Sequence, residues 1–207
     1  MQIPDRDVLT KFFPDTAVES VQRILEKHGI LLVITRDRLS KLGDFKPGNA
    51  RRPHRISVNG SLNKYACLLV FLHELAHLGI YKDFGRTVLP HGKEWKHNFG
   101  KLIRKCIAVG MFPEELAETL YTYSFKVKAS GMADATLTKK LRVYDSGTMP
   151  EGWRHLDELP EKILFQIKNG RAFAKGDKLR TRYRCQCLHT KRQYLVHSLA
   201  LVKKLED

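Results

Sequence analysis

The chain has 207 residues, 43% of them hydrophobic, which is enough for one good core or for a catalytic domain with a small second domain. Its formal net charge of +15 favours a polyanionic partner, most often nucleic acid, over a basic surface that has no dedicated partner. The longest apolar run is too short to span a bilayer, and the first residues lack the apolar stretch of a signal peptide. We therefore expect a cytoplasmic protein with no membrane partner.

The first part of the chain predicts a helix followed by strands. Residues 15–28 carry apolar side chains at helical spacing and predict an amphipathic helix. The β-branched run at 30–34 predicts a central strand, and the alternating residues 54–59 predict a strand at the sheet edge. Such an edge can pair with an extended substrate backbone. The polar stretch 41–53, which contains glycine and proline, predicts a loop.

The next segment carries the motif with the clearest chemistry. Apolar residues at three- and four-residue spacing predict a buried helix that begins near Ser61 and ends near Gly79. Within it, His73 and His77 are four residues apart and therefore lie on one helical face, with Glu74 beside the first. This H-E-x-x-H spacing lets two imidazoles share a Zn²⁺ ion and places a carboxylate near an attacking water. The alternative is a pair of core histidines that bind backbone carbonyls.

A catalytic zinc needs a third protein ligand and one open position. Three downstream residues are candidates: Asp83, Glu94 and His91. Asp83 would fit a zinc-binding pattern that requires a glycine at a set position before it, and this chain lacks that glycine. Glu94 would fit a different zinc-binding pattern, in which the third ligand is a glutamate on the following helix. His91 precedes a predicted helix that runs through Trp95, so its ring could face the first helix across a short connection. The sequence favours His91.

Together these residues resemble a known family. The run His73-Glu74-Leu75-Ala76-His77, followed by His91-Gly92-Lys93-Glu94-Trp95, is similar to the SprT-like metallopeptidases, which include bacterial SprT proteins and the DNA-repair protease Spartan. The resemblance covers roughly residues 15–125. It implies a zincin-like fold, zinc on His73, His77 and His91, and Glu74 as the general base. It also implies an activity on proteins crosslinked to DNA.

Glycine, serine and proline near residues 130–150 indicate a domain boundary. We therefore predict an α+β protein with a zincin-like catalytic domain over 1–130 and a linker over 131–150. Residues 151–207 would form a small, basic, β-rich C-terminal subdomain, in which 179–187 and 194–197 predict a hairpin.

The first strand of that hairpin carries a row of arginines. Because side chains alternate along a strand, Arg180, Arg182 and Arg184 should share one face, with Tyr183 on the other. A guanidinium group can donate two hydrogen bonds to one phosphate, so we predict sequence-independent contacts with the DNA backbone. The predicted nucleic-acid-binding residues are Arg180, Arg182, Arg184, Lys178, Lys175 and Arg171. A solvated sheet face without a partner is the alternative.

The same strand ends in a cysteine pair. Cys185 and Cys187, with His189 nearby, could hold a second, structural zinc. SprT proteins often carry a C-terminal zinc ribbon that begins with a similar pair, but this chain has no second pair. The sequence favours cysteines that simply pack in the core.

Two functional hypotheses follow. The first is a zinc-dependent endopeptidase that acts on proteins associated with or crosslinked to DNA. The second is a non-catalytic nucleic-acid-binding protein with a structural or vestigial zinc site. The presence of Glu74 favours the enzyme, because a purely structural site has no use for that carboxylate.

Overall fold

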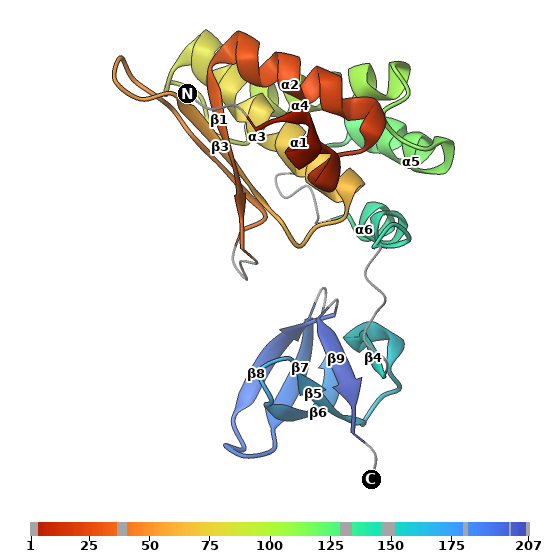
Figure 1. Ribbon diagram of the computed structural model, residues 1–207. Helices are drawn as coiled ribbons and strands as arrows, with labels where there is room; N and C mark the ends of the chain where they lie inside the picture. Colours follow the sequence, from red (N-terminus) through yellow and green to blue (C-terminus); the bar gives the residue numbers. More distant parts are fainter. Residues whose placement is uncertain are drawn as a thin grey trace. The chain divides into compact units, whose positions relative to one another are not determined.

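The computed structural model describes residues 4–36, 41–128, 134–145, 152–179, 182–198 and 200–205. The chain divides into two compact units, Met1–Ser146 and Gly147–Asp207 (Figure 1). The expectation of a mixed α+β protein is confirmed. Among the described residues, no helix combines the length and apolar character that a membrane span requires.

The first unit combines helices with a small three-stranded sheet. The strands are ordered β1-β3-β2, with β1 parallel and β2 antiparallel to β3. The helix α3 contacts both β2 and β3. The elements of this unit are α1 (Arg6–Phe12), α2 (Asp15–His28), β1 (Ile30–Thr35), β2 (Gly43–Lys46), β3 (His54–Asn59), α3 (Lys64–Phe84), α4 (Lys93–Ala108), α5 (Glu114–Phe125) and α6 (Ala135–Arg142).

The sheet corrects two expectations. The strand at 54–59 was expected at the edge and the strand at 30–34 in the centre, but β3 lies between β1 and β2. The described strands β1 and β2 form the two edges of the sheet, and β2 lies inside the stretch predicted as a loop. Its four residues, Gly43–Lys46, carry only one apolar side chain, so no alternating pattern reveals the strand.

The long helix α3 forms the centre of the first unit. The side chain of Asn63, rather than Ser61, caps its start by accepting a hydrogen bond from the Ala66 amide at 2.9 Å. The predicted end at Gly79 is also wrong, because the helix continues to Phe84. Gly85, with φ of +62°, follows the last helical residue in a conformation that favours glycine. The helix therefore extends almost two turns beyond His77.

The predicted linker at 131–150 contains a helix of the first unit. Leu137 and Leu141 of α6 are buried in the same core as α3 and α5. The Asn63 side chain also donates a hydrogen bond to the Leu141 carbonyl at 2.9 Å. This short helix could not be recognised by length alone, because it spans only eight residues.

The second unit is a six-stranded antiparallel sheet in the order β4-β9-β5-β6-β7-β8. The expected hairpin is confirmed, since β7 pairs with β8 in antiparallel register. Phe165, Phe173 and Val202 lie at its core. The elements are β4 (Trp153–His155), a 3₁₀ turn (Leu156–Glu158), β5 (Leu164–Ile167), β6 (Ala172–Lys178), β7 (Arg182–Cys187), β8 (Gln193–His197) and β9 (Leu201–Lys204).

Candidate metal centre

Two of the predicted ligands lie on one face of α3. His73 and His77 are one helical turn apart, and their ring centroids are separated by 5.1 Å. Twelve of the 21 residues of this helix are buried, and all of them except Glu74 are apolar. The packing of the helix in the core therefore fixes the positions of both histidines.

His91 completes the group from the connection between α3 and α4. The Gly92 amide donates to the Leu89 carbonyl at 3.0 Å, and the Gly92 carbonyl accepts from Lys96 at the start of α4. This turn brings Nε2 of His91 to 3.1 Å from Nε2 of His77 and 3.3 Å from Nε2 of His73.

These distances match the requirements of a metal ion. In a tetrahedral zinc site with Zn–N bonds of about 2.0–2.1 Å, the ligand nitrogens are about 3.3–3.4 Å apart. The distances from Nε2 of His91 to the other two Nε2 atoms are close to this spacing, and all three ligand atoms lie within 4.8 Å of one another. Within the described ranges, His73, His77 and His91 are the one group of possible ligands that converges. Three histidines from two segments leave a fourth tetrahedral position for solvent or substrate.

Trp95 forms the wall behind the imidazoles. Its ring is fully buried and lies 4.6 Å from the ring of His73, 5.2 Å from that of His77 and 4.7 Å from that of His91, measured between centroids. Phe99, one turn along α4, packs on both Trp95 and His73. These aromatic rings limit the positions that the imidazoles can adopt.

The environment keeps the histidines neutral. Desolvation by burial lowers the pKa of His73 to about 3 and that of His77 to about 4, with the neighbouring rings adding to the effect. Burial, followed by the charge of Lys96, also lowers the pKa of His91. A metal binds the neutral imidazole, so the site is ready to bind at neutral pH.

Glu74 follows His73 on α3, and its side chain lies beside the start of β2. Its side chain is only 6% exposed. A Cβ atom added to Gly43, the first residue of β2, would lie 2.6 Å from Oε1 of Glu74. Gly43 therefore leaves room for this carboxylate, a role that the sequence did not reveal because Gly43 fell in a predicted loop.

The other candidate ligands stand apart from the group. Asp83 is exposed near the end of α3, and Glu94 lies near Lys93, 3.9 Å from its ammonium group. Neither residue belongs to the converging group. His97 is exposed and lines a different pocket.

The cysteine pair lies in the second unit. Cys185 and Cys187 are buried on the inner face of β7, and Cys67 and Cys106 are buried in the first unit. Desolvation raises the pKa of Cys185, whereas a hydrogen bond from the Thr190 side chain lowers the pKa of Cys187 to about 6. The two thiols thus experience different environments although they are two residues apart.

The predicted basic face is only partly present. Arg182 and Arg184 are exposed on one face of β7 while Tyr183 is buried on the other, as the alternation predicts. Arg180 lies outside the described residues. Lys178 pairs in register with Tyr183, so it lies on the face opposite the two arginines.

Lys175 and Arg171 also depart from the expectation. Lys175 is only 4% exposed, and its ammonium group donates to the Leu159 carbonyl and lies 4.2 Å from the Tyr183 ring centroid. It is therefore unavailable to phosphates. Arg171 lies over the rings of Phe173 and Tyr194. Alternation along β6 places Lys175 on the same face as the buried Phe173, so the expectation followed the charge of Lys175 and not its position in the strand.

Comparisons with protein-family models, with curated proteins and with solved structures found no match for this chain. The three converging histidines and the adjacent buried carboxylate therefore carry the functional argument.

Proposed function

We propose that the chain is a zinc-dependent endopeptidase of the SprT-like type, with a zincin-like first unit. One observation carries the proposal: three imidazoles converge close to the spacing of zinc ligands, and Glu74, which follows the first of them in sequence, has a buried side chain. The residue types and their order along the chain are those of the H-E-x-x-H hydrolases.

His73, His77 and His91 would hold the ion, which when bound supplies the Lewis acidity that polarises a peptide carbonyl and lowers the pKa of water. Glu74 would accept a proton from the attacking water as its oxygen bonds to the carbonyl carbon. Glu74 would then give that proton to the nitrogen of the leaving amine as the C–N bond breaks. The products are a carboxylic acid and an amine, and transfer of the acid's proton to the amine gives a carboxylate and an ammonium ion, so atoms and charge balance.

The edge strand suggests how a peptide would be held. β2 pairs with β3 on one side only, so its other side is free to bind an extended chain by backbone hydrogen bonds. Gly43, which begins this strand, lies against Glu74. A substrate aligned along β2 would thus pass close to the carboxylate.

The charge of the chain supports a substrate that is associated with DNA. A net charge of +15 attracts polyanions without regard to base sequence. The proposed substrates are proteins bound or crosslinked to DNA, as in DNA repair. The exposed Arg182 and Arg184 are candidates for backbone contacts.

Proteolysis by matched variants tests the proposal. The native chain, Glu74→Gln and the control Glu94→Gln are loaded with zinc and incubated with an unfolded protein and with the same protein crosslinked to DNA. All three should bind one zinc, and only Glu74→Gln should lose cleavage, by at least about 100-fold. Cleavage by none of the three, with zinc bound and DNA held tightly, would favour the non-catalytic alternative.

A further inference from the structure

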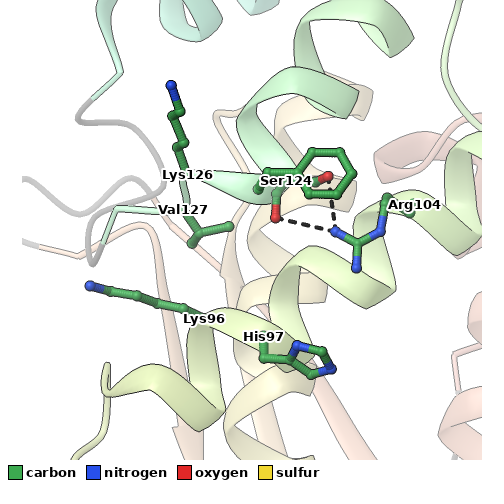
Figure 2. A pocket seen from close by; sticks show the side chains of 7 residues that line it. Lys96, His97, Arg104, Ser124, Lys126 and Val127 are labelled. Atoms are coloured by element: carbon green, nitrogen blue, oxygen red, sulfur yellow. Dashed lines mark hydrogen bonds between the residues drawn. The ribbon is translucent and has the colours of Figure 1, made fainter.

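A second feature of the first unit is a basic pocket between α4 and the end of α5 (Figure 2). Its volume is about 420 Å³, within the range of small-ligand pockets. Three of its side chains are basic, namely Lys96, Arg104 and Lys126. Among the described residues, none that lines it has a carboxylate; the lining consists of Lys96, His97, Arg104, Ser124, Phe125, Lys126 and Val127.

The guanidinium group of Arg104 is held in place. Its Nη1 donates to the carbonyl of Ser124 at 3.3 Å and to the hydroxyl at 3.1 Å (Figure 2). Gly100 lets the two helices approach closely, because a Cβ atom there would collide with the Ser124 carbonyl. These contacts engage only Nη1, whereas a guanidinium group has five N–H donors. The other N–H groups of Arg104 can therefore donate to an anion from a fixed position.

Aromatic side chains accompany these charges. Phe125, which lines the pocket, is 62% exposed, and its centroid lies 4.7 Å from Cζ of Arg104. Tyr121, one turn earlier on α5, is 52% exposed and packs edge-on against Phe125 at 5.2 Å. Two large exposed rings next to three cations form the combination that binds unstacked bases and phosphates together.

We infer that this pocket binds a single-stranded segment of nucleic acid, with a base against Phe125 and phosphates on Lys96, Arg104 and Lys126. An acidic peptide would use the cations but would leave the exposed rings without a role. A duplex keeps its bases stacked and cannot offer one to Phe125. The inference deepens the proposed function, since it gives the DNA a binding site.

The position of the pocket connects it with the metal centre. Lys96 follows Trp95, which packs on all three imidazoles, so both sites share the first turn of α4. A protein attached to the bound strand would be held close to Glu74. This site is separate from the arginines of β7, which belong to the second unit.

Binding of a fluorescent 15-nucleotide oligo-dT, measured by anisotropy at several salt concentrations, tests the inference. The parent chain is zinc-loaded Glu74→Gln, so that binding is measured without turnover. Lys96→Ala with Lys126→Ala should weaken binding at least tenfold and reduce the salt slope by about 1.4, which is 0.7 for each phosphate contact. Phe125→Ala should weaken binding at least fivefold, because a stacked base is lost.

The controls separate this site from general charge effects. Lys105→Ala removes a cation from the same helix outside the pocket and should change the affinity less than twofold. Thermal unfolding and zinc content of each variant establish that the fold is intact. Duplex DNA of equal length and polyglutamate should bind more weakly than oligo-dT.

Two outcomes would overturn the inference. One is an unchanged affinity in the pocket variants together with a loss in Arg182→Ala/Arg184→Ala. The other is tighter binding of polyglutamate that Phe125→Ala does not affect. Cleavage assays on the native chain are independent of these binding measurements, so failure of the nucleic-acid inference does not refute the peptidase proposal. Conversely, a chain that binds oligo-dT at this pocket without cleaving protein would refute the peptidase proposal alone.

Discussion

A Cβ atom at Gly43 would lie 2.6 Å from Oε1 of Glu74 and equally close to Cγ1 of Val70. The edge strand and the metal-binding helix thus meet at a residue without a side chain. This contact limits where the carboxylate of Glu74 can lie, and it ties the proposed general base to the strand on which a substrate would align.

Gly43→Ala should therefore impair cleavage without impairing zinc binding. The added methyl group must displace Glu74 or Val70, because real Cβ contacts are not observed at this distance. We expect at least a tenfold fall in kcat/KM, since misplacement of a catalytic group by about 1 Å can cost about 100-fold. Zinc content and peptide hydrolysis are measured on the same sample. Full activity at native zinc content would show that the Glu74 position is not restricted by β2.

Trp95 should stabilise the metal centre by its volume rather than by its polar group. The ring is fully buried, and its Nε1 has no hydrogen-bond partner among the described atoms. Trp95→Ala should lower the free energy of unfolding by about 3–5 kcal/mol and weaken zinc binding. Trp95→Phe should cost clearly less, because it keeps one aromatic ring and so loses less buried volume, and the donor that it removes is unpaired. Equal losses in the two variants by chemical denaturation would contradict this account.

The histidines should make the metal-free protein sensitive to acid. The pKa of His73 is about 3 in the folded chain, against 6.5 for an unperturbed histidine, so the unfolded chain binds more protons between these values. Stability is therefore fully present above pH 6.5 and falls as the pH is lowered toward 3. For His73 alone the loss approaches about 1.4 kcal/mol per pH unit.

Urea denaturation of chelator-treated protein between about pH 7.5 and about pH 4.5 measures this dependence. The control His97→Ala removes an exposed histidine and should leave the slope unchanged. His73→Phe should make the slope shallower, whatever its effect on absolute stability. A slope that does not change in His73→Phe would mean that this ring is not held neutral by burial.

Asn63 should stabilise the first unit at two places. Its side chain caps α3 and also donates to the Leu141 carbonyl of α6. Asn63→Ala should cost about 2 kcal/mol or more, since a lost cap costs about 1 kcal/mol and an unpaired buried carbonyl adds a similar amount. The control Asp5→Ala removes only the cap of the short helix α1 and should cost at most about 1 kcal/mol. Thermal denaturation of Asn63→Ala and Asp5→Ala measures both losses of stability. Equal decreases in the melting temperature would argue against a stabilising hydrogen bond from Asn63 to α6.

Sequence reasoning predicted the convergence of the three histidines better than it predicted their surroundings. His73 and His77 follow from helical spacing, which depends on local geometry alone, and His91 follows from the short connection between two predicted helices. Gly43 was missed because its strand is held by pairing with β3 rather than by an alternating pattern. The basic pocket was missed because Lys96 and Arg104 meet Lys126 only through the packing of α4 on α5.

In the C-terminal unit, the sequence predicted the exposed arginines correctly but not the lysines. Alternation along β7 correctly placed Arg182, Arg184 and Tyr183. The lysines of β6 were assigned by charge alone, although alternation along the strand places Lys175 on the buried face with Phe173, where its ammonium group lies against the Tyr183 ring. Charge density along a strand therefore did not show which of its basic side chains are exposed.

Zinc K-edge X-ray absorption of the purified, zinc-loaded chain tests the central claim most directly. The account predicts one zinc per chain with three imidazole nitrogens at about 2.0–2.1 Å, one further light-atom ligand, and loss of this spectrum in His91→Ala. A sulfur ligand at about 2.3 Å, or a spectrum that His91→Ala leaves unchanged, would contradict it.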